Sequence, residues 1–336
     1  MMQGSDEALY RKINVLRFLL ICCVLQAHSE NYPQFGLLSG TGCSIEQHVL
    51  ASMEWVVSMY YMLSSFLFFR GFQWNQLLGK WKRRIFTLVI PYIIWNTVYF
   101  GFFALLPRIP FFAQFINSEP APLTVSNVLF GVLLNRYAGF LWFVKTLIIF
   151  ILCAPLFYVL FSKKYIAEFS LIALFLFLFR NPFQFPAVLN LHWRFIFFFS
   201  VGAYFGLRAP HVAYYTPPRA VRYVLLCAIP LYAYHHTLYT TEMYSVLVIL
   251  SLWLGIDGSA IRERSWYNTS FFVYLTHFLA LSILKKIQYA LVPHTELWML
   301  ISYFSVTIIA LCLLVPLAQL LRRYTPKTYA ILFGGR

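Results

Sequence analysis

An arginine and a histidine lie eleven residues apart inside the first hydrophobic segment of the chain, at Arg17 and His28. An arginine within a membrane span is costly unless a partner or a wet cavity compensates its charge. At about 100° per helical residue the two side chains point in nearly the same direction, roughly 16 Å apart along the axis. A helix with both groups on one face, at two depths, is suited to a polar substrate.

Two more ionisable groups within apolar segments could act with this pair. Glu54, near the outer end of the second segment, can lie at the depth of His28, and a carboxylate beside an imidazole favours a general base acting on a hydroxyl. An ion pair made for stability alone, with Arg17 or Lys145, explains Glu54 equally well. His277, in the middle of a later segment, either belongs to the site or is a satisfied polar group packed between helices.

A cluster of cations precedes the third hydrophobic segment. Its members are Lys80, Lys82, Arg83 and Arg84. One interpretation is an ordinary cytoplasmic flank that faces anionic lipid. The other is a clamp for the phosphates of a carrier at the cytoplasmic mouth, from which a thin arm extends between the helices. The chain contains no Walker A or GxGxxG pattern, so a nucleotide-hydrolysing motor is not supported.

The fourth hydrophobic segment opens with Trp142 and, one turn deeper, Lys145. A tryptophan near the outer interface is typical of an aromatic-belt anchor. The lysine within the apolar segment is harder to explain in that way. We therefore count Trp142, Lys145 and His277 as candidate substrate contacts.

The composition predicts a polytopic membrane protein. Of the 336 residues 61% are hydrophobic and only 11% charged, whereas soluble domains carry about 25% charged residues. The net charge of +15 fits the positive-inside rule, and the scattered cations argue against a nucleic-acid partner. The six cysteines show no CxxC and no metal-ligand spacing, so we expect neither a disulfide framework nor a bound metal.

We predict one all-α membrane domain over residues 1–336, a transmembrane helical bundle of about ten spans. The spans lie near 13–29, 49–70, 85–106, 140–161, 166–180, 191–208, 221–235, 239–256, 268–290 and 296–321. No cleavage site follows the first span, so we expect it to be retained. Most cations fall on one side, which predicts that both termini are cytoplasmic. Arg17 is then near the inner end of the first span and His28 near its outer end.

Six short motifs, in order along the whole chain, resemble those of the integral-membrane acyltransferase-3 family, a group of ten-span bacterial O-acyltransferases. They are Arg-x10-His at residues 17–28, an aromatic stretch at 60–67, a basic run with Pro-Tyr at 82–84 and 91–92, Leu-Trp-Phe at 141–143, Phe-Phe-x-x-Gly at 198–202 and Tyr-Leu-x-His at 274–277. Two positions depart from the family: Ser65 replaces a glycine, and Phe140 replaces a histidine that many members carry. The second departure weakens an acceptor-binding role for the region of Trp142.

The resemblance implies transfer of an acyl group, most commonly acetyl, from cytoplasmic acyl-coenzyme A to a hydroxyl of an envelope polysaccharide or lipid-linked glycan. It implies a multi-pass protein of the bacterial inner membrane, with Arg17 and His28 as the acyl-transfer pair. The basic run at 82–84 would contact the phosphates of acetyl-coenzyme A. His28 is then a general base or a covalent acyl acceptor, and Arg17 positions the donor or stabilises developing charge.

Two other functions compete with this one. A transporter or flippase of an envelope precursor often shows internal repeats and paired broken spans, and the chain has no clear repeat. A structural or regulatory membrane subunit would leave the polar groups of the first span without a purpose.

Overall fold

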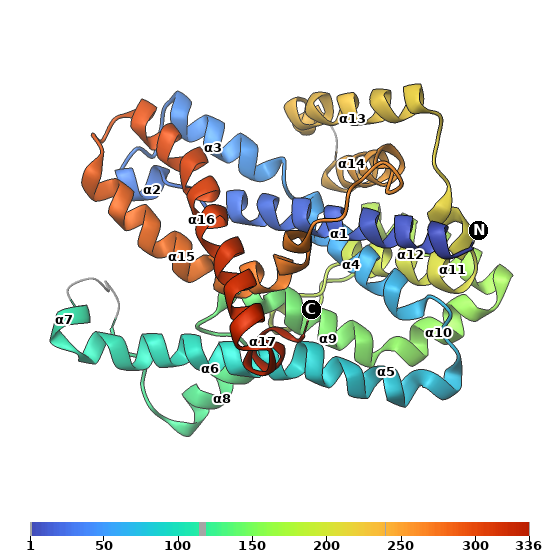
Figure 1. Ribbon diagram of the computed structural model, residues 1–336, viewed down its shortest axis with the longest axis horizontal. Coiled ribbons are helices and arrows are strands. Elements are labelled where there is room, and N and C mark those ends of the chain that lie inside the picture. Colours follow the sequence, from blue (N-terminus) through green and yellow to red (C-terminus); the bar gives the residue numbers. More distant parts are fainter. Residues whose placement is uncertain (1, 114–118, 239, 336) are drawn as a thin grey trace. The chain divides into compact units, whose positions relative to one another are not determined.

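The computed structural model describes residues 2–113, 119–238 and 240–335, with side chains from residue 6 onward. Within these ranges the chain forms α-helices, short 3₁₀ turns and one π-helical turn, without a β-strand (Figure 1). The predicted all-α class is therefore confirmed.

A helix occupies each of the ten predicted spans. These helices are α1 Met2–Ala27, α4 Trp55–Phe69, α6 Ile90–Leu105, α9 Trp142–Leu152 with α10 Ala154–Ser162, α11 Lys164–Arg180, α12 Trp193–Leu207, α13 Arg219–Tyr234, α14 Thr241–Gly255, α15 Ser270–Leu291 and α16 Glu296–Tyr324. The remaining helices are α2 Tyr32–Phe35, α3 Thr41–Ala51, α5 Leu77–Arg84, α7 Pro110–Ala113, α8 Val125–Leu133 and α17 Pro326–Phe333.

Among the described residues, three helical stretches are long and apolar enough to cross a membrane. They are Trp74–Arg108, Ser265–Leu291 and Glu296–Tyr324. Gly139–Leu152 and Ala154–Ser162 form a fourth candidate, bent by 56°. The apolar helices support a multi-pass membrane protein, while the number of ten spans and the cytoplasmic termini stay predictions.

The bend between α9 and α10 has a local cause. Pro155 carries no N–H and therefore cannot bond the carbonyl of Ile151 four residues earlier. The indole N–H of Trp81 in α5 donates to that carbonyl instead, at 2.8 Å. The proline thus breaks the helix, and the freed carbonyl anchors α5 against α9.

The chain divides into two compact units. The first contains residues 1–71, 160–181 and 193–320, and the second contains 72–159, 182–192 and 321–336. The first includes α1, α4, α12, α14 and α15, and the second includes α5, α6, α9 and α17.

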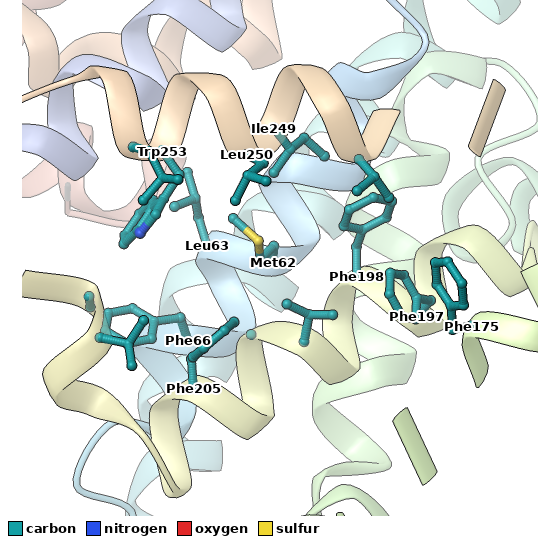
Figure 2. Close-up of a pocket in the computed structure, with 16 residues that line it drawn as sticks. Met62, Leu63, Phe66, Phe175, Phe197, Phe198, Phe205, Ile249, Leu250 and Trp253 are labelled. Atoms are coloured by element: carbon teal, nitrogen blue, oxygen red, sulfur yellow. The ribbon is translucent and has the colours of Figure 1, made fainter. Parts of the chain in front are cut away.

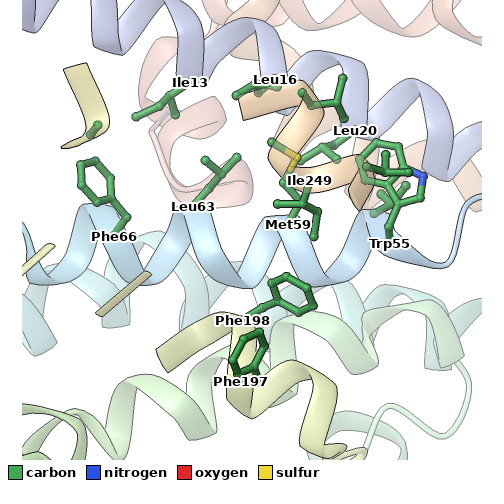
Figure 3. Packing of buried hydrophobic residues seen from close by; sticks show 14 of the residues in the cluster. Ile13, Leu16, Leu20, Trp55, Met59, Leu63, Phe66, Phe197, Phe198 and Ile249 are labelled. Carbon is green, nitrogen blue, oxygen red and sulfur yellow. The ribbon is translucent and has the colours of Figure 1, made fainter. Parts of the chain in front are cut away.

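The core of the first unit lies between α1, α4, α12 and α14. Ile13, Leu16 and Leu20 follow the helical spacing of one face of α1 and are fully buried. Figure 3 shows this face toward α4, with Met59 among the residues it meets. Burial of this stripe fixes the rotation of α1 about its axis, and with it the directions of the polar side chains on α1.

Two glycines let α12 approach α4 closely. A Cβ on Gly202 would collide with the carbonyl oxygen of Met62, and one on Gly206 would lie 2.9 Å from that of Phe66. Small residues at a membrane helix interface permit such backbone contact. Ser65 is fully buried opposite Gly202. A small side chain at this position therefore preserves the close packing.

Gly202→Ala is expected to lower the melting temperature of the purified protein by several degrees, because overpacking costs about 1–3 kcal/mol. Gly101→Ala in α6 is the matched control, since a Cβ there meets nothing within 4 Å. Alanine favours a helix interior over glycine by about 1 kcal/mol, so the control should be neutral or stabilised. Equal melting temperatures for the two variants, measured in the same detergent, would contradict this packing.

In the second unit, α5 continues into α6 through the π-helical turn Ile85–Val89. The cause is Pro91, whose ring would clash with the carbonyl of Thr87 in a regular α-helix. Gly334, at the end of α17, packs on Thr87, and a Cβ there would lie 2.5 Å from the same carbonyl. The packing of Gly334 on Thr87 thus holds in place the π-helical turn that follows the basic helix α5.

Candidate active site

The end of α1 holds His28 in a defined turn. The N–H of His28 still bonds the carbonyl of Leu25, at 3.1 Å. Ser29 Oγ donates to the same carbonyl at 2.7 Å and lies 2.8 Å from the hydroxyl of Thr307 on α16. Since these bonds satisfy a carbonyl left free at the helix end, they fix the backbone of His28 while its side chain stays exposed.

His28 lies beside His277 of α15. The centroids of the two imidazole rings are 5.2 Å apart, with 40° between the ring planes. His277 is fully buried, and its Nδ1 is 2.6 Å from the carbonyl oxygen of Tyr274. A carbonyl only accepts hydrogen bonds, so Nδ1 of His277 carries the proton and Nε2 carries the lone pair in the neutral ring. The structure therefore joins the first and last of the six sequence motifs.

A buried carboxylate in α3 holds the loop that follows His28. Glu46 Oε2 accepts the backbone N–H groups of Asn31 and Tyr32, at 2.7 and 3.1 Å. Burial raises the pKa of Glu46 above its ordinary value, although these two donors oppose the rise. Sequence reasoning missed Glu46, because a single glutamate between two apolar segments carries no motif.

Arg17 is half-buried on α1. Its backbone carbonyl accepts the hydroxyl of Tyr60 at 3.0 Å. Among the described residues, no carboxylate lies within ion-pair distance of its guanidinium. The group is therefore available to an anion or to a substrate carbonyl.

The partner of Glu54 differs from the partners that the sequence predicts. Its Oε2 lies 3.2 Å from Nη1 of Arg194 on α12, and 46% of the glutamate side chain is exposed. The predicted partner His28 has its ring contact with His277 instead. The ion pair joins the start of α4 to α12, so stability alone accounts for what the structure shows of Glu54.

An apolar cavity of about 240 Å³ lies between α4, α11, α12 and α14 of the first unit. Figure 2 shows Met62 and Phe66 of α4, Phe205 of α12 and Trp253 of α14 on its walls. All its lining side chains are apolar, apart from the indole N–H. It offers no acid or base, in contrast to the region of His28 and His277.

In the second unit, the cations of the basic cluster differ in exposure. Lys82 and Arg83 are exposed, and Lys80 and Arg84 are half-buried. Lys80 Nζ lies 5.2 Å from the ring centroid of Phe72. Arg84 borders a cavity of about 130 Å³ that is otherwise lined by Trp81 and aliphatic residues. The two exposed cations are accessible to a phosphate.

Lys145, also in the second unit, has a structural partner. Its Nζ donates to the carbonyl of Val188 at 2.6 Å, and only 9% of the residue is exposed. Thr146 Oγ1 lies 3.2 Å from the carbonyl of Leu189 and 3.0 Å from that of Trp142. Both side chains thus fasten α9 to the 3₁₀ turn Ala187–Leu189.

In the part of the chain that the structure describes, no group of three or more His, Cys, Asp or Glu could hold a metal ion. All six cysteines are free. The candidate site in the first unit offers an accessible imidazole, a second imidazole whose Nδ1 bonds the carbonyl of Tyr274, and a guanidinium with no carboxylate partner among the described residues. Such groups can move a proton and stabilise negative charge.

The chain matches a known protein family. The family described as "Acyltransferase domain" matches residues 10–323, nearly the whole chain. No curated protein and no solved structure matches at a significant level.

Proposed function

Because the chain belongs to the acyltransferase-3 family and is an acyltransferase, we propose that it transfers an acyl group, typically acetyl, from acyl-coenzyme A to a hydroxyl of a cell-envelope polysaccharide or lipid-linked glycan. We also propose that it is a multi-pass protein of the bacterial inner membrane with both termini in the cytoplasm. The family match supports the reaction class. The identity of the acyl donor, the identity of the acceptor and the location in the bacterial inner membrane are what we propose.

The proposed mechanism rests on the close approach of the His28 and His277 rings, whose centroids are 5.2 Å apart. One ring is exposed, and the other is buried with its Nδ1 bonded to a backbone carbonyl. A fixed, buried imidazole beside an accessible one limits the orientations of the accessible ring. An oriented base removes a hydroxyl proton more effectively than a freely rotating one.

In the proposed reaction, the acceptor oxygen attacks the thioester carbonyl carbon while His28 takes the hydroxyl proton. The carbon–sulfur bond breaks, and the departing thiolate receives a proton. A two-step alternative has the imidazole of His28 attack the thioester first, after which the acyl-histidine passes its acyl group to the hydroxyl. In either route Arg17 positions the donor, because roughly 16 Å along α1 separate it from the atoms that react at His28.

Other residues enter the proposal with separate roles. We propose that Lys80, Lys82, Arg83 and Arg84 bind the phosphates of the acyl donor. Glu54 is proposed to support the acid–base chemistry, in addition to its bond with Arg194. His277, Trp142 and Lys145 are proposed acceptor contacts, and for Lys145 this role adds to its bond with the carbonyl of Val188.

The reaction is tested with purified protein, labelled acetyl-coenzyme A and an envelope glycan extract. Lys82→Gln combined with Arg83→Gln is expected to raise KM for the donor about three- to tenfold, because exposed ion pairs contribute modestly. The effect should shrink as salt is added. Lys163→Gln with Lys164→Gln at the start of α11 is the matched control, since both lysines are exposed and should leave KM unchanged.

Absence of any label transfer would contradict the function. Transfer with an unchanged KM in the α5 double variant would contradict only the phosphate-binding role of that helix. Movement of a glycan precursor across liposomes without coenzyme A would instead favour a transporter.

A further inference from the structure

A cavity of about 250 Å³ with charged and hydroxyl groups among its lining residues lies beside the N-terminal part of α1, within the first unit and apart from His28. It is bounded by α1, by the stretch that follows α12 and by the loop after α14. Its walls include Ala8, Lys12, Tyr214, Thr216, Asp257 and Ser259. None of these residues belongs to the proposed reaction.

The loop after α14 is held firmly against α1. Arg11 Nε donates to the carbonyl of Gly258 at 3.1 Å. A Cβ on Gly258 would collide with the carbonyl of Ala8 and lie 3.0 Å from Cβ of Lys12. Only glycine permits this approach, so the wall of the cavity is preformed.

Lys12 is the unusual group of this cavity. Only 4% of the residue is exposed, and its Nζ lies 4.3 Å from the ring centroid of Trp253. Among the described residues, its ammonium group has no hydrogen-bond acceptor and no carboxylate within ion-pair distance. A buried ammonium without such a partner is costly.

The carboxylates near the cavity are already engaged. Asp257 accepts from Arg222 at 2.7 Å and from the N–H and hydroxyl of Ser259 at 2.9 and 2.6 Å. Burial alone would raise the pKa of Asp257, but the bonds from Ser259 and Arg222 outweigh it and hold the pKa below its ordinary value.

A second carboxylate, Asp6, binds the hydroxyl of Tyr214 and the guanidinium of Arg70. Each of the two carboxylates thus forms an ion pair with a different arginine. Lys12 is attracted by Asp257 but forms no ion pair among the described residues, so it remains a positive charge of the cavity without a partner of its own.

We propose that this cavity binds a phosphate group, with Lys12 as its principal ligand. A phosphate oxygen would accept a charge-assisted hydrogen bond from Nζ, and the hydroxyl of Thr216 on the wall is a further donor. The volume admits a phosphate with several water molecules. The phosphate belongs to the acyl donor or to a phospholipid headgroup; the first source rests on the proposed function, whereas the binding site itself does not.

The test measures binding of inorganic pyrophosphate to the full-length protein in neutral-lipid nanodiscs by calorimetry. Lys12→Met, which keeps the length of the side chain and removes its charge, is expected to weaken binding at least tenfold. Lys12→Arg should retain most of the affinity. Lys164→Met, on the exposed start of α11, is the matched control and should bind as the wild type does.

Competition then identifies the source of the phosphate. Displacement of pyrophosphate by coenzyme A supports the acyl donor, and displacement by phosphatidylglycerol added to the nanodiscs supports a lipid headgroup. Either result upholds the site. Failure of coenzyme A alone would exclude the acyl donor as the source of the phosphate in this cavity and would leave the proposed reaction, whose donor phosphates lie on α5, unaffected.

A measurement on the wild type covers the case in which Lys12→Met does not fold. Cyanate carbamylates accessible amines, and mass spectrometry reports the rate at each lysine. Pyrophosphate is expected to slow carbamylation of Lys12 severalfold and to leave Lys164 unaffected. Absence of pyrophosphate binding, binding that Lys12→Met does not change, or carbamylation of Lys12 without protection would each overturn the proposal.

Discussion

His28→Ala is expected to lower kcat for acyl transfer by about 10²- to 10⁴-fold, the usual contribution of a positioned acid or base. KM for the acyl donor should change little, because the imidazole acts on the reacting atoms and not on the phosphates. The measurement is label transfer from acetyl-coenzyme A to the glycan under saturating donor. His235→Ala, at an exposed position after α13, is the matched control and should retain wild-type activity.

The wild-type protein and His28→Ala also distinguish the direct route from the route through an acyl-histidine. If His28 becomes acylated, wild-type protein incubated with labelled donor and no acceptor should retain label that hydroxylamine releases, and His28→Ala should retain none. If His28 is only a base, neither protein retains label although the loss of activity is the same. Undiminished transfer by His28→Ala would contradict both routes and the proposed site.

Arg17→Ala is expected to lower kcat/KM about 10²-fold, because a donor that is displaced by even a small distance reacts about that much more slowly. Its guanidinium has no carboxylate partner in the described part of the chain, so the loss should not come from a broken ion pair. Arg17→Lys keeps the positive charge but lacks the planar guanidinium with its several donors, so it should recover part of kcat/KM relative to Arg17→Ala. Steady-state kinetics with donor and acceptor varied in turn measure these changes.

Arg180→Ala, at the exposed end of α11, is the matched control for the removal of an arginine. It should leave kcat/KM unchanged. Melting temperatures of both variants separate a loss of function from a loss of fold. A kcat/KM of Arg17→Ala within threefold of the wild type would remove Arg17 from the mechanism and leave it as a structural cation.

Two of the predicted site residues have structural partners that explain their presence within apolar helices. Glu54 was expected near His28, and its ion pair with Arg194 gives it a structural role independent of chemistry. Lys145 was counted as a substrate contact, and its bond to the carbonyl of Val188 likewise gives it a structural partner. Both are polar groups within apolar helices, and such groups find partners wherever the packing supplies them.

The sequence by itself determined the all-α class, the positions of the helices within the predicted apolar segments, and the placement of Arg17 on the first helix with His28 in the turn at its end. These features follow from composition and from the 3.6-residue periodicity of apolar side chains, which can be read from a few consecutive helical turns. The ordered motifs were also enough to indicate the family that the match over residues 10–323 confirms.

Only the tertiary structure decided which polar groups meet. It brought His277 to His28, placed Glu46 under the loop after His28 and left Lys12 facing a cavity. A membrane helix is apolar around most of its circumference, so its sequence does not mark the face that packs on a neighbour. Partners far apart in the chain are chosen by helix packing, and that choice is made by close-approach positions such as Gly202 and Gly258.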